Sequence, residues 1–194
     1  MRGKHGIETF LEMGNVMLGW AQNEESHDPG GLELIRRGIA SWRATGADLV
    51  VPHFQQILAA ALLENGNYGE ALTAIEQALA LIPATADHSF EAECWRLKGD
   101  LIWRCRSDSA RLDEAENCLS KAVEISRQQK ALSLELRAQV SLGQLLTQKG
   151  EAESAQRSLA ETYAQFQEDF GSEDLRQAKT ALDRLRSLTS CHFV

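Results

Sequence analysis

Four charged residues and a tryptophan have the spacing needed to hold a polar ligand. The charged residues recur every three or four positions, which places them on one face of a helix: Glu93, Arg96, Asp100 and Arg104. Trp103 lies beside them, and we expect Arg137 to join from the next hairpin. Such a row could clamp the carboxylate of a peptide or a polar effector through charge-assisted hydrogen bonds. Alternatively, the neighbouring opposite charges neutralise each other, each pair contributing roughly 0.2–0.5 kcal/mol.

No known catalytic motif accompanies this row. The sequence has no phosphate-binding G-x-x-x-x-G-K-[ST] loop, no H-E-x-x-H zinc motif and no G-x-S-x-G elbow. Cys94, Cys105, Cys118 and Cys191 do not form a C-x-x-C pair, which favours reduced, core-filling thiols. We therefore expect no catalytic, cofactor-binding or metal-ligating residues, and no cofactor.

Charge and hydropathy narrow the choice of partners. The 194-residue chain has 28 acidic and 20 basic residues, whereas nucleic-acid surfaces gather positive charge. No run approaches the roughly 18 apolar residues of a membrane span. The first 20 residues lack the apolar stretch of a secretory leader. We expect a cytoplasmic protein that contacts neither nucleic acid nor membrane directly.

Helices are expected almost throughout, because apolar residues recur at spacings of three and four between turn signals. Asp28 and Pro29 mark a helix start, Gly46 a left-handed helix end, and Pro83 the stop of a helix that begins at Tyr68. Ser172 can cap a final helix. The predicted single domain, residues 1–194, contains four antiparallel hairpins at about 6–45, 49–82, 87–129 and 132–169, followed by a capping helix at 172–189.

Small residues recur at intervals of about forty and mark where paired helices should cross closely. A larger side chain at such a crossing would push the two backbones apart. One series falls in the first helix of each hairpin: Gly19, Ala59, Gly99 and Gly143. The other falls in the second helix: Gly31, Ala71, Ala115 and Ala155. This period is typical of stacked helical hairpins.

The second hairpin carries a recognisable signature. Ala71, Ala78 and Pro83 have the spacing of the three downstream signature positions of the tetratricopeptide repeat, and Ala59 and Leu62 fit upstream ones. The chain therefore resembles tetratricopeptide arrays, which implies an all-α solenoid whose concave groove is lined by the first helix of each hairpin. Aligning the repeats nominates these groove residues: Trp20, His53, Gln56, Glu93, Arg96, Asp100, Trp103, Arg104, Arg137 and Gln144.

Longer segments show a second resemblance. The segments concerned are Gly31–Gly46 (GLELIRRGIASWRATG), Glu91–Leu101 (EAECWRLKGDL), Ala122–Leu142 (AVEISRQQKALSLELRAQVSL) and Phe166–Leu185 (FQEDFGSEDLRQAKTALDRL). They resemble the C-terminal helical repeats of bacterial predicted ATPases, which often bear a class III adenylate or guanylate cyclase domain or a winged-helix domain. This resemblance implies a fragment or stand-alone relic of a multidomain regulator, and it brings no catalytic residue with it.

Two functions remain open at this point. The first, which we favour, is a protein-interaction module that docks a protein or peptide, including the catalytic domains of its own regulator. The second is an effector-sensing domain, similar to the helical-repeat sensor of maltose-responsive transcription regulators. In either case the first hairpin lacks a preceding cap, so a homo-oligomer formed through its exposed apolar area is a further expectation.

Overall fold

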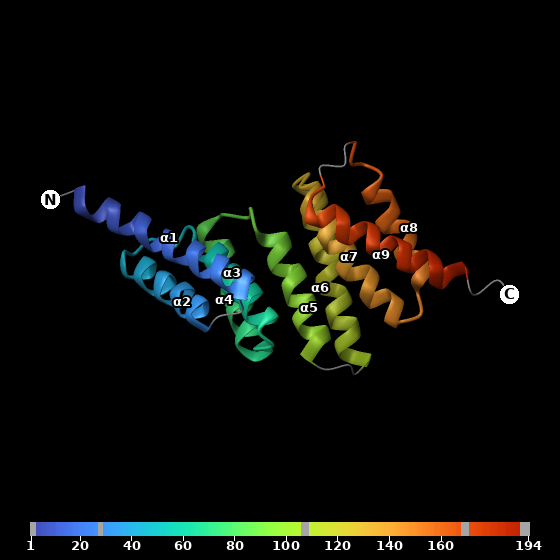
Figure 1. The fold of residues 1–194 in the computed structure, drawn as a ribbon, viewed down its shortest axis with the longest axis horizontal. Helices are drawn as coiled ribbons and strands as arrows, with labels where there is room; N and C mark the ends of the chain where they lie inside the picture. The colour runs from blue at the N-terminus through green and yellow to red at the C-terminus, as the bar shows by residue number, and fades with distance from the viewer. Residues whose placement is uncertain (1–2, 27–28, 106–108, 168–170, 191–194) are drawn as a thin grey trace. The chain divides into compact units, whose positions relative to one another are not determined.

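The computed structural model describes residues 3–26, 29–105, 109–167 and 171–190, and these residues form helices and turns without a strand (Figure 1). The helices are α1 (Gly3–Ser26), α2 (Pro29–Ala44), α3 (Val51–Glu64), α4 (Tyr68–Thr85), α5 (Glu91–Cys105), α6 (Ser109–Gln128), α7 (Leu132–Gln148), α8 (Ala152–Tyr163) and α9 (Glu173–Ser190). They divide into two compact units, Met1–Leu97 and Lys98–Val194, with the boundary inside α5. That the whole chain is a single domain stays a prediction.

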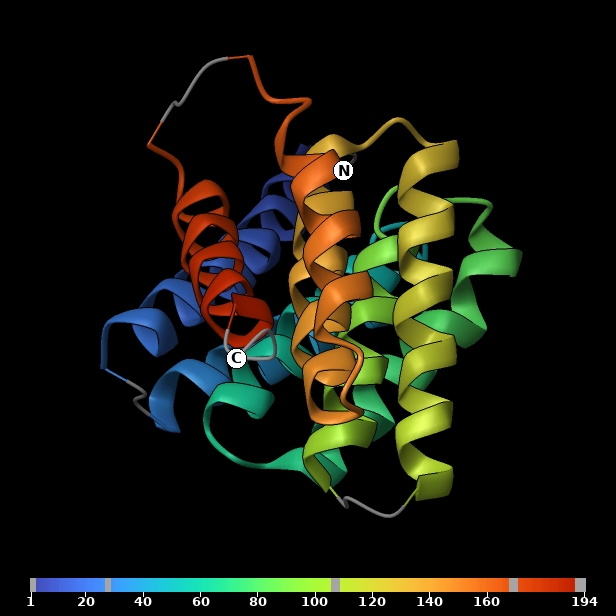
Figure 2. The same cartoon turned by 90° about the vertical axis from the view of Figure 1, so that its right-hand side faces the viewer.

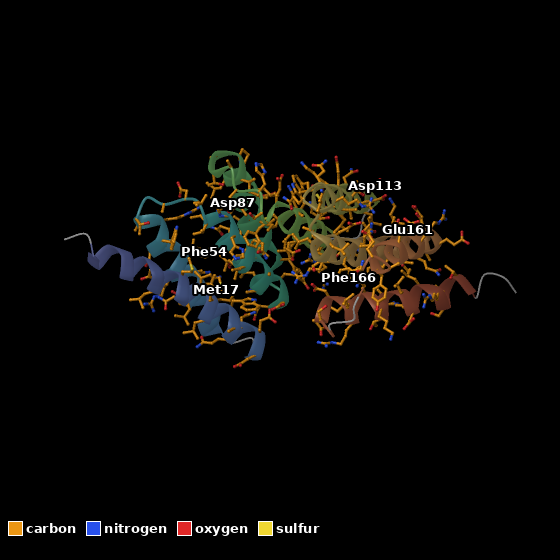
Figure 3. All side chains as sticks on the ribbon, turned by 90° about the horizontal axis from the view of Figure 1, so that it is seen from above. Met17, Phe54, Asp87, Asp113, Glu161 and Phe166 are labelled. Atoms are coloured by element: carbon orange, nitrogen blue, oxygen red, sulfur yellow. The ribbon has the colours of Figure 1, made fainter. Side chains whose placement is uncertain are left out.

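The first unit contains two helical hairpins. Helix α1 packs along α2, α3 packs along α4, and α2 and α1 both contact α3 (Figure 1). The core between them is apolar, with Ile35, Phe54 and Ile75 almost fully buried (Phe54 is labelled in Figure 3). The Trp42 ring meets the Phe54 ring edge-on at a centroid distance of 5.5 Å. The hairpins are thus joined through an aromatic contact between α2 and α3.

Glycine determines how closely α1 and α2 approach. A Cβ atom on Gly19 would lie 2.5 Å from the Gly31 carbonyl oxygen, and one on Gly31 would lie 2.6 Å from the Gly19 oxygen. A Cβ atom on Gly99 of α5 would similarly lie 2.6 Å from the Cγ atom of Leu119 on α6. The small residues of the other hairpins are buried: Ala59, Ala71, Ala78, Ala115 and Ala155.

Gly143 departs from this pattern. A Cβ atom there would be 3.8 Å from Leu185 and 3.9 Å from the Ala155 methyl group, which is ordinary van der Waals contact. The opposing alanine already leaves room, so this crossing does not require glycine. At Gly143 the small-residue period falls where α7 meets Ala155 of α8, but it does not indicate how tight the contact is.

Several predicted boundaries were wrong. Helix α4 continues through Pro83 to Thr85, because a proline in the last turn removes only one N–H; the helix closes where the Ala86 N–H donates to the Ile82 oxygen at 2.9 Å. The third hairpin begins with α5 at Glu91 rather than at residue 87. Asp28 lies outside the described residues.

Helix α8 ends at Tyr163, well before the expected residue 169. The chain then turns, with the Gln165 and Phe166 N–H groups donating to carbonyls three residues earlier at 3.2 Å. The turn brings Phe166, labelled in Figure 3, against the apolar cluster of the second unit. Phe166 is partly buried there, so the helix ends where this ring packs on residues distant in sequence.

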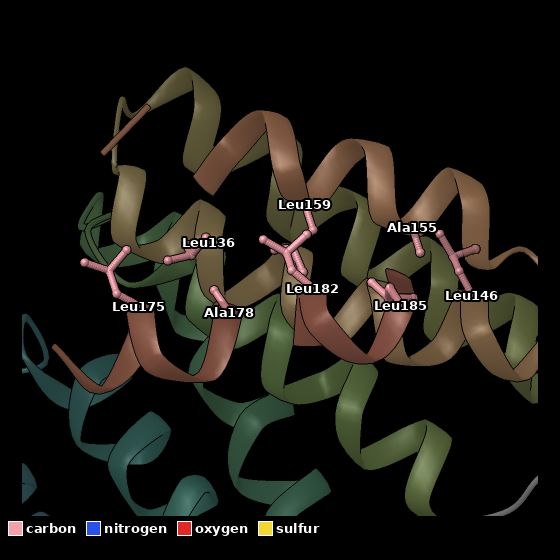
Figure 4. Close-up of a cluster of buried hydrophobic side chains, with 8 residues drawn as sticks. All are labelled: Leu136, Leu146, Ala155, Leu159, Leu175, Ala178, Leu182 and Leu185. Carbon is pink, nitrogen blue, oxygen red and sulfur yellow. The ribbon is translucent and has the colours of Figure 1, made fainter. Parts of the chain in front are cut away.

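In the second unit α7 contacts both α6 and α8, and α9 contacts both α7 and α8. Figure 2 shows α9, in red, on the side of α7 and α8 that faces away from α6. The expected cap is confirmed, because the Ser172 hydroxyl accepts a hydrogen bond from the Leu175 N–H at 3.3 Å. Gly46 is confirmed as a left-handed residue with φ of 77°. Helix α9 contributes half of a buried cluster formed by Leu136, Leu146, Ala155, Leu159, Leu175, Ala178, Leu182 and Leu185 (Figure 4).

Candidate ligand-binding groove

A cavity of about 720 Å³ lies between α7 and α9, with one side chain contributed by α5. We call it the α7–α9 cavity. Its lining residues are Trp103, Val140, Gly143, Gln144, Thr147, Gln148, Glu173, Arg176, Gln177, Thr180, Ala181, Arg184 and Leu185. A volume of this size falls within the range of roughly 300–1,000 Å³ that is common for ligand pockets.

The lining combines an apolar base with amide and hydroxyl groups. Val140, Ala181 and Leu185 provide aliphatic surface, and Trp103 provides a partly exposed indole. The indole N–H of Trp103 donates to the Gln148 side-chain oxygen at 2.6 Å, which holds the ring of α5 against α7. Such a surface can bury an apolar group while its polar atoms bond to a peptide backbone.

Charge is concentrated on the α9 wall. Arg176 donates two hydrogen bonds to the Glu173 carboxylate, at 2.7 and 3.0 Å, and a third to the Gly171 carbonyl. The bonds from Arg176 hold the pKa of Glu173 below its usual range. Arg184 is exposed two turns further along the same helix. A bound carboxylate could therefore reach Arg184 without breaking the Arg176–Glu173 pair.

The nominated residues of the second unit do not all face this cavity. Trp103 and Gln144 line it, and Arg104 is exposed. Asp100 is buried, and its carboxylate accepts a hydrogen bond from the Ser141 hydroxyl of α7 at 3.2 Å. Arg137 donates to Asp174 at the start of α9, at 2.8 Å. Asp100 and Arg137 thus tie α5 and α9 to α7.

In the first unit, Glu93 and Arg96 pair with each other. The Arg96 guanidinium donates to both carboxylate oxygens of Glu93, at 2.6 and 2.9 Å, and Glu93 is only 6% exposed. This bidentate, partly buried pair matches the two opposite charges within one helix turn. This geometry agrees with the neutralised alternative for these two residues.

His53 is held between apolar groups rather than presented as a free base. Its ring stacks on Phe90 at a centroid distance of 3.7 Å, and burial lowers its pKa. Gln56 and Asp87 oppose that shift. Gln56 is partly exposed one turn further along α3, and Trp20 of α1 is exposed. These three nominated residues belong to the first unit.

The cysteines behave as packing residues where the structure describes them. Cys94 and Cys118 are buried, and burial raises the pKa of both, that of Cys94 to about 12. Cys105 is partly exposed, and Cys191 lies outside the described residues. Within the described ranges, no cluster of three His, Cys, Asp or Glu residues could hold a metal ion, and no helix combines the length and apolarity needed to cross a bilayer.

Sequence reasoning missed the α9 wall. Gln177, Thr180, Ala181 and Arg184 have helical spacing and form a face beside the leucine stripe of α9. The spacing of these residues indicates a second face of α9, whereas the expected capping role uses only the apolar face. A second hollow of about 570 Å³, on α2, α3 and α4 and crossed by an Arg36–Glu70 ion pair of 2.6 Å, was also not nominated.

Comparison with known proteins supports the fold. A tetratricopeptide repeat profile matches residues 53–85. Yeast Tom70 superposes with a TM-score of 0.67 at 17% identity over 92% of this chain and 34% of that one. A thermophilic tetratricopeptide protein of Thermus thermophilus gives 0.67 at 18% identity over 92% and 82%. A putative kinesin light chain from Podosopora anserina with tetratricopeptide-like repeats gives 0.68 at 17% over 92% and 86%.

These comparisons confirm the all-α, tetratricopeptide-like solenoid fold expected from the sequence. The chain spans about a third of the length of the Tom70 structure. No curated protein sequence matches it at a significant level. At sequence identities below 20%, these similarities show the fold and not the function.

Proposed function

We propose that this chain is a non-catalytic interaction module of tetratricopeptide type, and that its α7–α9 cavity receives an extended segment of a protein partner. One observation carries the proposal: a cavity of about 720 Å³ with an apolar base and an amide-rich rim lies on the first helix of a hairpin, where the resemblance puts the groove. Proteins bind extended peptides by combining side-chain pockets with bonds to the peptide backbone.

The lining indicates the chemistry of the partner. The Trp103 indole and the aliphatic base fit an apolar side chain, and Gln144, Gln148 and Gln177 offer both donors and acceptors to backbone amides. Arg184 adds an exposed cation. We therefore propose a peptide with an apolar anchor residue followed by a carboxylate.

The test begins with selection from a phage-displayed peptide library on the purified chain, followed by fluorescence anisotropy with the selected peptides. Trp103→Ala and Arg184→Glu should each weaken binding at least about tenfold, a loss of about 1.4 kcal/mol. Lys179→Glu is the matched control, since Lys179 is also exposed on α9 but does not line the cavity. Circular dichroism verifies that each variant keeps its helices.

Two results would contradict the proposal. One is a library that yields no enriched peptide. The other is a set of selected peptides whose affinity Trp103→Ala and Arg184→Glu leave unchanged, because such peptides would bind elsewhere on the chain.

A second candidate function is effector sensing, favoured by the cavity volume, which suits a small metabolite as well as a peptide side chain. In that case nucleotides or sugars should raise the melting temperature of the chain, and Arg184→Glu should remove the effect. Thermal-shift screening with nucleotides and sugars separates the two candidates, since the docking function gives peptide binders without a metabolite response.

The wider context is also a proposal. The resemblance of Gly31–Gly46 and Ala122–Leu142 to regulator repeats supports a C-terminal part or relic of a bacterial signalling ATPase or adenylate cyclase, acting in the cytoplasm. The partner would then include the ATPase or cyclase domains of that regulator. Reading the genomic frame upstream of Met1 tests this directly. We further propose that the chain self-associates through its first hairpin.

A further inference from the structure

One face of α1 carries apolar side chains that the described chain leaves in solvent. Leu11 is 61% exposed and Leu18 is 50% exposed, and Gly14 lies between them. Their spacing of three and four residues puts all three on one side of the helix. The opposite side, with Val16 and Gly19, is buried toward α2. We call the exposed stripe the α1 face.

The equivalent face of α3, in the same unit, is covered by other residues. Helix α1 and helix α3 are offset by forty residues, so Leu11, Gly14 and Leu18 correspond to Val51, Phe54 and Leu58. The equivalent positions in α3 are all buried, and Phe54 packs on Trp42 of the preceding helix, α2. In the next hairpin, a face of this kind therefore packs on the preceding helix.

Gly14 gives an independent reason to expect a helix there. Gly19, Gly31, Gly38 and Gly99 each lie where a Cβ atom would come within 2.6 Å of a neighbour, so each marks a close helix crossing. Around Gly14, apart from the neighbouring backbone of α1 itself, no heavy atom of the described chain lies within 4 Å of a Cβ position. A glycine inside a helix weakens it relative to alanine. A second helix crossing closely at Gly14 would give this residue the role that the other glycines have.

We propose that the occupant of the α1 face is the α1 face of a second copy of this chain, in a two-fold dimer whose α1 helices cross antiparallel at Gly14. This inference deepens the self-association proposed above. The spacing is self-complementary, because Leu11 precedes Gly14 by three residues and Leu18 follows it by four. An antiparallel crossing at Gly14 therefore places Leu11 of each copy near Leu18 of the other.

Head-to-tail assembly is disfavoured by the character of α9. Its apolar residues Leu175, Leu182 and Leu185 are buried in its own unit. Its exposed positions are mainly charged and include Glu173, Arg176, Lys179, Asp183 and Arg186, although Leu188 is 39% exposed. A leucine stripe gains little by packing on a charged helix surface. The two-fold arrangement instead pairs apolar surface with apolar surface.

Light scattering after gel filtration and sedimentation equilibrium measure the mass of the whole chain up to hundreds of micromolar. We expect a concentration-dependent approach to twice 21.5 kDa. Leu18→Glu should weaken the dimer roughly a hundredfold, because it buries a carboxylate twice in one interface. Leu49→Glu is the matched control, since Leu49 is a similarly exposed leucine outside α1.

Gly14→Leu tests the crossing itself. Leucine favours a helix more than glycine does, so the monomer should be as stable as the parent or more so, yet the dimer should weaken. A chain that stays monomeric over this concentration range overturns the proposal. Dimers that survive Leu18→Glu, or that Gly14→Leu leaves intact, also overturn it. Peptide binding to the α7–α9 cavity should persist in both variants, which keeps the two proposals separable.

Discussion

Replacing Gly19 with alanine should destabilise the α1–α2 hairpin. The new methyl carbon would lie 2.5 Å from the Gly31 carbonyl oxygen and 2.9 Å from the Leu34 Cβ atom. Because the nearest obstacle is backbone, no rotation of a side chain can relieve the contact, and the two helices must separate. Overpacking of this kind costs about 1–3 kcal/mol. The better helix propensity of alanine offsets about 1 kcal/mol of this cost, which leaves a net loss of about 0–2 kcal/mol.

Two other glycines calibrate the effect. Gly143→Ala has room for its methyl group, so it should stabilise the chain by up to about 1 kcal/mol. Gly99→Ala meets the Cγ atom of the buried Leu119 at 2.6 Å and the Ala115 carbonyl oxygen only at 3.1 Å, so it should fall between the other two. Urea denaturation followed by circular dichroism ranks the variants, and hydrogen exchange of α1 and α7 assigns each change to its unit. A Gly19→Ala chain as stable as Gly143→Ala would refute the close crossing.

Three further predictions concern single side chains. Burial lowers the pKa of His53 in the folded chain, so the unfolded chain binds the proton first as the pH falls. The stability of the folded chain should therefore decline below about pH 6.5. His53→Gln should flatten that decline, as melting curves at several pH values would show. Burial raises the pKa of Cys94 to about 12. Cys94 should therefore react with iodoacetamide far more slowly than the partly exposed Cys105, as peptide mass spectrometry would show. Equal reaction rates would contradict the burial of Cys94. Leu182→Ala should lower the free energy of unfolding by about 2–5 kcal/mol, because Leu182 is buried in the α7–α8–α9 cluster. Leu188→Ala, at an exposed position, should lower it by less than about 0.5 kcal/mol. Urea denaturation measures both.

The helices and their pairing could be read from the sequence because their signals are local. Gly46 and Ser172 are turn and cap residues whose conformations depend on their immediate neighbours, and both have the expected roles. Pro83 shows the limit of such signals, since a proline in the last turn is tolerated without ending the helix. The end of α8 was also missed, because it depends on the burial of Phe166 against residues distant in sequence.

The candidate site was only partly predictable for the same reason. The sequence identified Trp103 and Gln144, which both line the cavity. It could not show that Asp100 is buried against Ser141, nor that Arg137 is paired with Asp174 of α9. Those outcomes depend on how deeply each helix face is covered, and the repeat period alone does not contain that information.

Two faces of helix α9 make contacts, and they link ligand binding in the α7–α9 cavity to the docking of this helix. One face closes the leucine cluster of the second unit, while the adjoining face forms a wall of the cavity. Whatever binds against that wall must favour the docked helix over a detached one, by thermodynamic linkage. Amide protons of α9 should therefore exchange more slowly when the cavity is filled, so the terminal helix would report a bound ligand even before that ligand is identified.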